Sequence, residues 1–383
     1  MNKFETAFRG SDIAQPADRQ TSSPARIPEL DGMRGIAILA VVIAHYFGEV
    51  EHGIVVFTFG WPGVTLFFVL SGFLIGSIIL EHNTSPNFFR VFYARRALRI
   101  LPVYFLTITA TLGFIHLYGP APWIDEPFPA LSYFTFTQNF GGSLGMIWLR
   151  PTWTLAVEEQ FYLLTPLLVF LLPARLLLPS IVGGIVACYL ASVLLGWDGF
   201  QMRGAGPLLY SSPVLLIGVF SAYLVRQRLE LPETARLIIP LASTSVVVAV
   251  AAFAPRSALY AVWPFMAALF AYCILLIMQG RRSPMFLRSR VLVGFGTISY
   301  CLYLIHQPIN GVMHGLIFGG TADIATAPQF LVTCAALVVS ISAATVSWLA
   351  LERPLLQFGR RMSYSDTTAH PAGVASPSCP RRS

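Results

Sequence analysis

The chain has 383 residues, of which 55% are hydrophobic and only 11% are charged, about half the charged fraction of a soluble domain. This composition indicates a membrane protein with little mass outside the bilayer and excludes an ordinary soluble enzyme. The formal net charge of +7 therefore bears on the orientation of membrane segments and does not indicate nucleic-acid binding.

Ten apolar segments are each about long enough to cross roughly 30 Å of hydrocarbon as a helix. They predict an all-α, polytopic membrane bundle within a single domain of residues 27–362. The segments are residues 35–55, 60–80, 99–118, 153–172, 179–197, 208–225, 237–254, 258–279, 292–318 and 328–351. An even number of spans places both termini on the same side of the membrane.

The basic residues predict which side that is. With a cytoplasmic N-terminus, 22 of the 25 lysines and arginines fall on the cytoplasmic side, and only Arg150, Arg203 and Arg256 fall on the other, as the positive-inside rule requires. Residues 1–26 are polar and have no apolar signal core, so they predict a disordered cytoplasmic arm. Residues 363–383 predict a similar tail. The five cysteines show no disulfide or metal-site spacing.

Arg34 and His45 lie eleven residues apart, at the start of the first apolar segment and within it. Eleven residues are close to three helical turns, so the two side chains share a helix face to within about 20° and lie roughly 16 Å apart along the axis. That spacing predicts His45 near the middle of the bilayer and Arg34 near its surface. A titratable imidazole at that depth is costly unless it has a partner or a function, so His45 is a candidate catalytic group.

Arg95 and Arg96 precede the third segment and are adjacent, so on a helix they point about 100° apart. They cannot both reach the membrane surface from one face, and one of them is expected to face the bundle. A guanidinium aimed inward at the cytoplasmic surface suits a phosphate group, because its planar fork binds phosphate oxygens in pairs.

Glu158 and Glu159 open the fourth segment on its non-cytoplasmic side, followed by Gln160. One glutamate in that position is explained by the positive end of the helix dipole. Two carboxylates and an amide at the start of an apolar helix are harder to explain in that way, because they are costly against lipid. At least one of the two glutamates is therefore expected to be functional, and the spacing does not choose between them.

Ser299, Tyr303 and His306 in the ninth segment follow i, i+4 and i+7 spacing, so they form one polar stripe on a helix. Such a stripe is typical of a helix that lines a wet or ligand-filled cavity. The three residues are candidate substrate contacts.

Taken in order, these motifs resemble the acyltransferase 3 family of integral membrane acyltransferases. The resemblance rests on LDGMRG at residues 30–35 with His45, FFVLSGFL at 67–74, YARR at 93–96, WTLAVEEQFY at 153–162 and SYCLYLIHQP at 299–308. Each motif alone is weak, whereas five in order are specific, and the match runs from residue 30 to residue 354. Thr154 stands where serine is common in the family and Met33 where leucine is common; both departures are mild.

The resemblance implies a ten-helix enzyme of the bacterial cytoplasmic membrane that transfers an acyl group, often acetyl, from cytoplasmic acyl-CoA to a hydroxyl of a carbohydrate or glycan precursor. It implies no permanently bound cofactor. Arg34 and His45 match the family's paired arginine and histidine motif. Arg95 and Arg96 match the basic pair near the acyl donor.

A mechanism follows as a hypothesis. His45 acts as general base or as a transient nucleophile, and Arg34, Arg95 and Arg96 hold the CoA phosphates at the cytoplasmic mouth. The extended pantetheine arm, on the order of 15–20 Å, is comparable to the ~16 Å helical rise between Arg34 and His45. Glu158 or Glu159, expected on the opposite side, orients either the imidazole or the incoming hydroxyl.

Two other functions fit part of the sequence. The acceptor of an acyltransferase can be a small, macrolide-like molecule instead of a glycan. Alternatively, ten spans with intramembrane ionisable residues suit a transporter or flippase of a polar or lipid-linked solute. The ordered motifs favour the enzyme, and consumption of the thioester by purified protein distinguishes it from a transporter. A membrane scaffold is disfavoured because it needs no ionisable centre. The oligomeric state stays open.

Overall fold

The computed structural model describes residues 27–58, 60–141, 145–194, 206–229, 232–253, 262–280 and 284–365. All regular structure within these ranges is helical, which confirms the predicted all-α class. The predicted arm at residues 1–26, and residues 366–383 of the predicted tail, lie outside the described residues.

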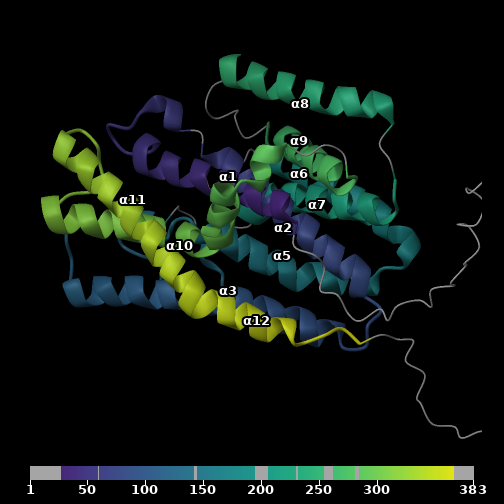
Figure 1. Cartoon of the computed structure of the whole chain (residues 1–383), viewed down its shortest axis with the longest axis horizontal. Coiled ribbons are helices and arrows are strands. Elements are labelled where there is room, and N and C mark those ends of the chain that lie inside the picture. Colours follow the sequence, from purple (N-terminus) through teal and green to yellow (C-terminus); the bar gives the residue numbers. More distant parts are fainter. Residues whose placement is uncertain are drawn as a thin grey trace, which may run out of the picture.

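A long helix occupies each of the ten predicted segments (Figure 1). These helices are α1 (Pro28–Ile43), α2 (Trp61–His82), α3 (Phe88–Tyr118), α5 (Thr152–Leu171), α6 (Ala174–Leu194), α7 (Gly206–Arg226), α8 (Glu233–Phe253), α9 (Trp263–Met278), α10 (Arg290–Phe318) and α11 (Ala327–Ser347). The shorter elements are η1 (Ala44–Gly48), η2 (Val55–Phe57), α4 (Ala130–Phe134), η3 (Gln138–Phe140), η4 (Ile147–Leu149), η6 (Met285–Arg288), η7 (Trp348–Glu352) and α12 (Arg353–Arg360).

Seven stretches of the described ranges are long and apolar enough to cross a membrane, so the chain is a multi-pass membrane protein. This number is smaller than the ten spans that the sequence predicts. Helix α9 has only 16 residues, fewer than the roughly 20 that a perpendicular span needs. Helix α10 has 29 residues, but polar side chains interrupt its apolar sequence.

Helix α1 begins earlier than the sequence predicts and ends differently. It starts at Pro28, where proline suits a first helical turn, so Arg34 lies within the helix and not at its beginning. It is followed directly by η1, the π-helical turn Ala44–Gly48, which contains His45. Single π-turns within α-helices often occur at functional sites, because the wider turn redirects a side chain.

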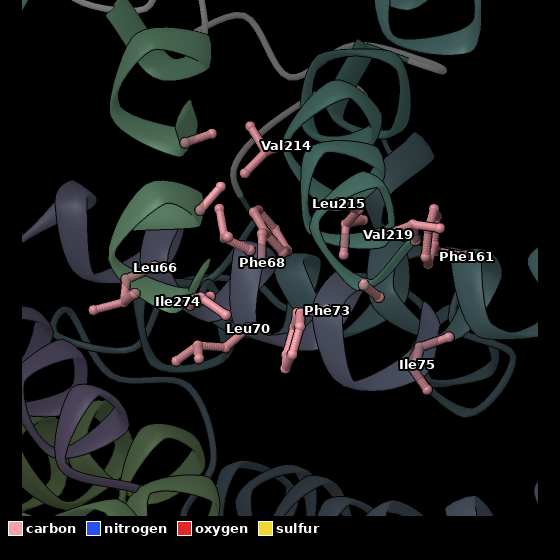
Figure 2. Packing of buried hydrophobic residues seen from close by; sticks show 14 of the residues in the cluster. Leu66, Phe68, Leu70, Phe73, Ile75, Phe161, Val214, Leu215, Val219 and Ile274 are labelled. Carbon is pink, nitrogen blue, oxygen red and sulfur yellow. The ribbon is translucent and has the colours of Figure 1, made fainter. Parts of the chain in front are cut away.

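Glycines allow the central helices to approach closely. A Cβ added at Gly296 of α10 would lie 1.9 Å from the Asp31 carbonyl oxygen of α1, and one added at Gly72 of α2 would lie 2.0 Å from the Leu215 carbonyl oxygen of α7. Small residues at helix interfaces permit such backbone contact in membranes. Figure 2 shows the apolar side chains that fill the space around α2 and α7, including Phe73.

Replacing Gly296 by valine is expected to destabilise the protein, because its side chain would overlap the α1 backbone; overpacking typically costs about 1–3 kcal/mol. Gly294 is a matched control on the same helix, since nothing lies within 4 Å of a Cβ added there. Thermal unfolding in detergent should show a lower midpoint for Gly296→Val than for Gly294→Val. Equal midpoints would show that α1 and α10 do not pack in this way.

Part of the described segment between α3 and α5 packs into the bundle. Its Trp148 and Trp123 are each 5% exposed, and they lie against α10 where a Cβ at Gly311 or Gly315 would come within 1.9 and 2.1 Å of the indole rings. Thr152, the first residue of α5, is fully buried as well. Helix α5 therefore begins inside the protein, which determines where its glutamates lie.

Candidate active site

A pocket lies between α1, α2, α3, α5 and α10. Five helices that are distant in sequence each contribute polar side chains to it. The polar lining consists of Arg34, Ser71, Arg96, Arg99, Thr154, Glu158, Tyr162, Ser299, Tyr300 and Tyr303.

Three guanidinium groups, those of Arg34, Arg96 and Arg99, line this pocket. None of them forms an ion pair within 4.0 Å with a carboxylate in the described part of the chain. Arg96 lies over the ring of Tyr162, 5.4 Å from its centroid, in a cation–π contact that orients the group without neutralising it. Clustered cations of this kind favour an anionic ligand, and their fork geometry suits phosphate.

Glu158 lines the same pocket as Arg34. The sequence had placed these two residues at opposite membrane faces, and the inward-folded segment before α5 is the reason that they meet. The Ser71 hydroxyl donates a hydrogen bond of 2.8 Å to the Glu158 carboxylate. Glu159 does not line the pocket, and its Oε1 is buried with no hydrogen-bond partner among the described residues.

Arg95 is also absent from the pocket lining. Its guanidinium donates to the carbonyl oxygens of Gly359, at 3.3 Å, and Met362, and lies 5.1 Å from the ring centroid of Tyr364. These contacts attach the end of α12 and the following residues to α3. The adjacent arginines therefore face different partners, as their 100° separation requires.

His45 and His306 form a directly hydrogen-bonded pair, with His45 Nδ1 2.7 Å from His306 Nε2. The two rings are parallel to within 1° and their centroids are 5.0 Å apart. That separation equals the nitrogen-to-nitrogen distance plus one ring radius on each side, so the rings meet edge to edge in one plane and are not stacked. A hydrogen bond in this plane points along the lone pair of the accepting nitrogen.

The partners of this pair determine which nitrogens carry protons when both rings are neutral. His306 Nδ1 lies 3.0 Å from the Leu302 carbonyl oxygen, which only accepts, so Nδ1 must donate. His306 Nε2 then has a lone pair and accepts from His45 Nδ1. The Nε2 of His45 is left without a proton and is available as a base or nucleophile.

Further contacts fix the pair on both sides. The Tyr46 hydroxyl donates to the His306 carbonyl oxygen at 2.7 Å and lies 2.8 Å from the Ser340 hydroxyl, which ties η1 to α10 and α11. On the other side, His45 Nε2 lies 3.6 Å from a Glu49 carboxylate oxygen. Glu49 and Arg150 also interact electrostatically, so charged groups lie beside the free nitrogen.

The α10 stripe divides between these two regions. Ser299 and Tyr303 line the arginine pocket, whereas His306 is fully buried and contacts His45 instead. Sequence reasoning did not select Arg99, Glu49 or Thr154. Arg99 and Glu49 could have been found from their spacing. Arg99 lies three residues after Arg96 and Glu49 lies four residues after His45, and residues three or four apart are neighbours on a helix.

An ion pair closes the loop that follows η1. The Asp323 carboxylate accepts hydrogen bonds from the His52 backbone N–H at 3.0 Å and from the His52 imidazole at 2.6 Å. The hydrogen bond to Asp323 raises the pKa of His52. Burial alone would raise the pKa of Asp323, but the hydrogen bonds from His52 outweigh it and lower that pKa. The pair connects the chain after His45 to the turn between α10 and α11.

The stabilisation by this pair is expected to depend on pH. The stabilisation is fully present at pH values between the ordinary pKa of aspartate, about 4, and the ordinary pKa of histidine, about 6.5. It is lost as pH falls through the lowered pKa of Asp323 and as pH rises through the raised pKa of His52. Thermal unfolding of the wild type and His52→Ala should differ most near pH 5–6 and least at high pH. A difference that is constant with pH would contradict the pairing.

Comparison with known proteins identifies a family for the chain. The acyltransferase domain family Acyl_transf_3 matches residues 27–350. O-acetyltransferase OatA of Staphylococcus aureus is 30% identical over 164 residues. The putative peptidoglycan O-acetyltransferase YrhL of Bacillus subtilis is 33% identical over 186 residues, and peptidoglycan O-acetyltransferase OatA of Listeria monocytogenes is 33% identical over 175 residues.

These alignments cover 40–42% of this chain and 26–27% of the relatives, so the chain spans about a quarter of the length of the curated relatives that it matches. No solved structure matches it at a comparable level of significance. The family match covers most of the chain, including every residue of the arginine pocket and of the histidine pair. The chain therefore belongs to the acyltransferase 3 family of membrane acyltransferases.

Proposed function

We propose that this chain transfers an acetyl group from acetyl-CoA to a hydroxyl group of a carbohydrate or glycan precursor. The observation that carries the proposal is the arrangement of two sites. A pocket with three arginines that form no ion pair among the described residues lies next to a histidine pair whose hydrogen bonds leave Nε2 of His45 without a proton. The names of the three relatives, all O-acetyltransferases and two of them described as acting on peptidoglycan, support the acetyl group and the glycan.

The pocket is proposed to hold the CoA donor. Its phosphates are bound by Arg34, Arg96 and Arg99. The sequence predicted Arg95 in this role, but Arg99 lines the pocket and Arg95 does not. Bidentate contacts between guanidinium and phosphate are strong and directional. The pantetheine arm then extends along α10 past Ser299 towards Tyr303 and the histidines.

The chemistry uses the lone pair on Nε2 of His45. As the acceptor oxygen attacks the thioester carbonyl, Nε2 takes the hydroxyl proton; the carbon–sulfur bond then breaks and the leaving thiolate takes the proton from the imidazolium. His306 shares the positive charge through the 2.7 Å hydrogen bond, and Glu49 lies close enough to stabilise it. If Nε2 instead carries the acyl group between two half-reactions, the same lone pair attacks the thioester first.

The distribution of basic residues gives the proposed orientation of the chain in the membrane. The chain crosses the membrane ten times with both termini in the cytoplasm of a bacterial cell, so acetyl-CoA enters from the cytoplasm. The acceptor approaches from the opposite side, near Glu49, whose side chain is 42% exposed, and Arg150. Donor and acceptor then meet at His45.

Mass spectrometry of surface glycans and secreted metabolites tests the acceptor. Cells that lack the gene should lose acetyl groups from a surface glycan, and the wild-type gene should restore them while His45→Ala should not. Loss of acetyl groups from a secreted small molecule instead would identify that class as the acceptor. Unchanged acetylation in both fractions would contradict the proposed function.

A further inference from the structure

The arginine pocket ends at Tyr303, and the histidine pair lies behind it. Tyr303 lines the pocket, whereas His45 and His306 do not. The ring of Tyr303 lies between the two regions, with its centroid 6.0 Å from the ring of Phe67, which also lines the pocket, and 6.0 Å from the ring of His306. Tyr303 is only 7% exposed. The ring therefore lies at the boundary between the pocket and His306, the partner of His45.

One hydrogen bond holds the phenol in that position. The Tyr303 hydroxyl lies 3.0 Å from the Thr154 hydroxyl. Thr154 uses its own proton to donate to the Pro151 carbonyl oxygen at 2.9 Å, so Tyr303 is the donor to Thr154. Because a threonine hydroxyl has a single proton, the donor and acceptor roles are fixed. The bond joins α10 to α5 across the end of the pocket.

A barrier here has a chemical use. An acyltransferase must keep its thioester away from the catalytic base and from water until an acceptor is bound, since excluding water prevents hydrolysis of reactive groups. A tyrosine held by one hydrogen bond can move with a change of side-chain rotamer, without rearrangement of the helices.

We infer that Tyr303 is a shutter between the donor pocket and the His45–His306 pair, kept closed by its hydrogen bond to Thr154. The inference rests on the proposed function for its purpose, and on the pocket lining and ring contacts for its position. Opening joins the pocket to Nε2 of His45, and closing separates donor from base. Tyr303 is a positioning residue in this role.

Chemical modification of a cysteine behind the shutter tests its position without reference to activity. In a background with the native cysteines replaced by alanine, His45→Cys in inside-out membrane vesicles is treated with a membrane-impermeant methanethiosulfonate reagent, so that the reagent enters from the side of the donor pocket and not from the side of Glu49. Adding Tyr303→Phe or Thr154→Val removes the hydrogen bond and is expected to raise the modification rate about two- to tenfold, the equilibrium effect of one such bond. Tyr303→Ala should raise it further.

Tyr300→Phe is the matched control. Tyr300 lies on the same helix and lines the same pocket, but its hydroxyl donates to the Ile100 carbonyl oxygen at 2.8 Å. Its loss should leave the modification rate at the value of the parent His45→Cys protein. Equal rates in the parent, Tyr303→Phe, Thr154→Val and Tyr303→Ala proteins would overturn the shutter.

Thiol release from acetyl-CoA gives a second readout with His45 intact. The rate of hydrolysis without acceptor, divided by the rate of transfer with acceptor, is expected to rise two- to tenfold in Tyr303→Phe and Thr154→Val. Tyr93→Phe removes a hydroxyl that donates to the Leu163 carbonyl oxygen and does not line the pocket, so it should leave that ratio unchanged. If the ratio of hydrolysis to transfer is unchanged in variants that are active, the shutter is contradicted but the proposed function is not. If the wild type releases no thiol with acceptor present, the proposed function fails, whereas the modification rates still report on the shutter.

Discussion

Replacing His45 by alanine is expected to abolish acetyl transfer while the protein stays folded in the membrane. Alanine removes the nitrogen that takes the hydroxyl proton or the acyl group, and a positioned general base contributes about 10²- to 10⁴-fold to a rate. The side chain is 18% exposed and its hydrogen bond is to His306, so its loss should affect stability much less than activity. Turnover of acetyl-CoA by purified protein in detergent measures the effect.

His116→Ala is the control for this prediction, because His116 is an exposed histidine in the last turn of α3. It should match the wild type in turnover and in thermal unfolding. If His45→Ala keeps wild-type turnover, His45 has no part in the chemistry. If it fails to accumulate as folded protein, the residue is primarily structural.

Replacing Arg34 or Arg99 by alanine is expected to raise the concentration of acetyl-CoA needed for half-maximal activity. Each guanidinium is proposed to make charge-assisted hydrogen bonds to a phosphate, worth about 1.5–3 kcal/mol, which corresponds to roughly ten- to hundredfold in affinity. The maximal rate should change less, because neither residue contacts the histidine pair. Steady-state kinetics with acetyl-CoA as the varied substrate measures both quantities.

Neighbouring arginines on α3 make this test specific. Arg90 is exposed and does not line the pocket, so Arg90→Ala should keep the wild-type acetyl-CoA requirement. Arg95→Ala should chiefly lower the thermal stability, because Arg95 holds the residues after α12. A larger rise in the acetyl-CoA requirement for Arg95→Ala than for Arg99→Ala would favour the assignment made from the sequence.

Hydropathy and charge predict the all-helical class and the positions of the ten long helices, because a membrane requires each span to satisfy its own backbone hydrogen bonds. The sequence does not predict that α5 starts inside the protein. Its apolar run predicts where a helix lies but not that the segment before it folds inward against Gly311 and Gly315. For this reason Glu158 was expected opposite Arg34 and instead shares its pocket.

The candidate site was predictable only in part, because residue types are visible in a sequence while partners are not. The stripe on α10 indicated that Ser299, Tyr303 and His306 face the interior, as they do. Nothing in the sequence indicates that His306 pairs with His45, 261 residues earlier, or that Tyr303 lies between the histidines and the pocket. Those contacts depend on how α1, α5 and α10 pack.

The coupling of thiol release to acetylation in purified wild-type protein tests the central claim most directly. Acetyl-CoA and a glycan acceptor are added, and free CoA thiol and acetylated acceptor are followed over time. We expect one thiol to be released for each acetyl group that appears on the acceptor, with neither product formed without protein. Intact acetyl-CoA, with acceptor moved across a membrane but not acetylated, would show that the chain is a transporter and would contradict the acyltransferase mechanism.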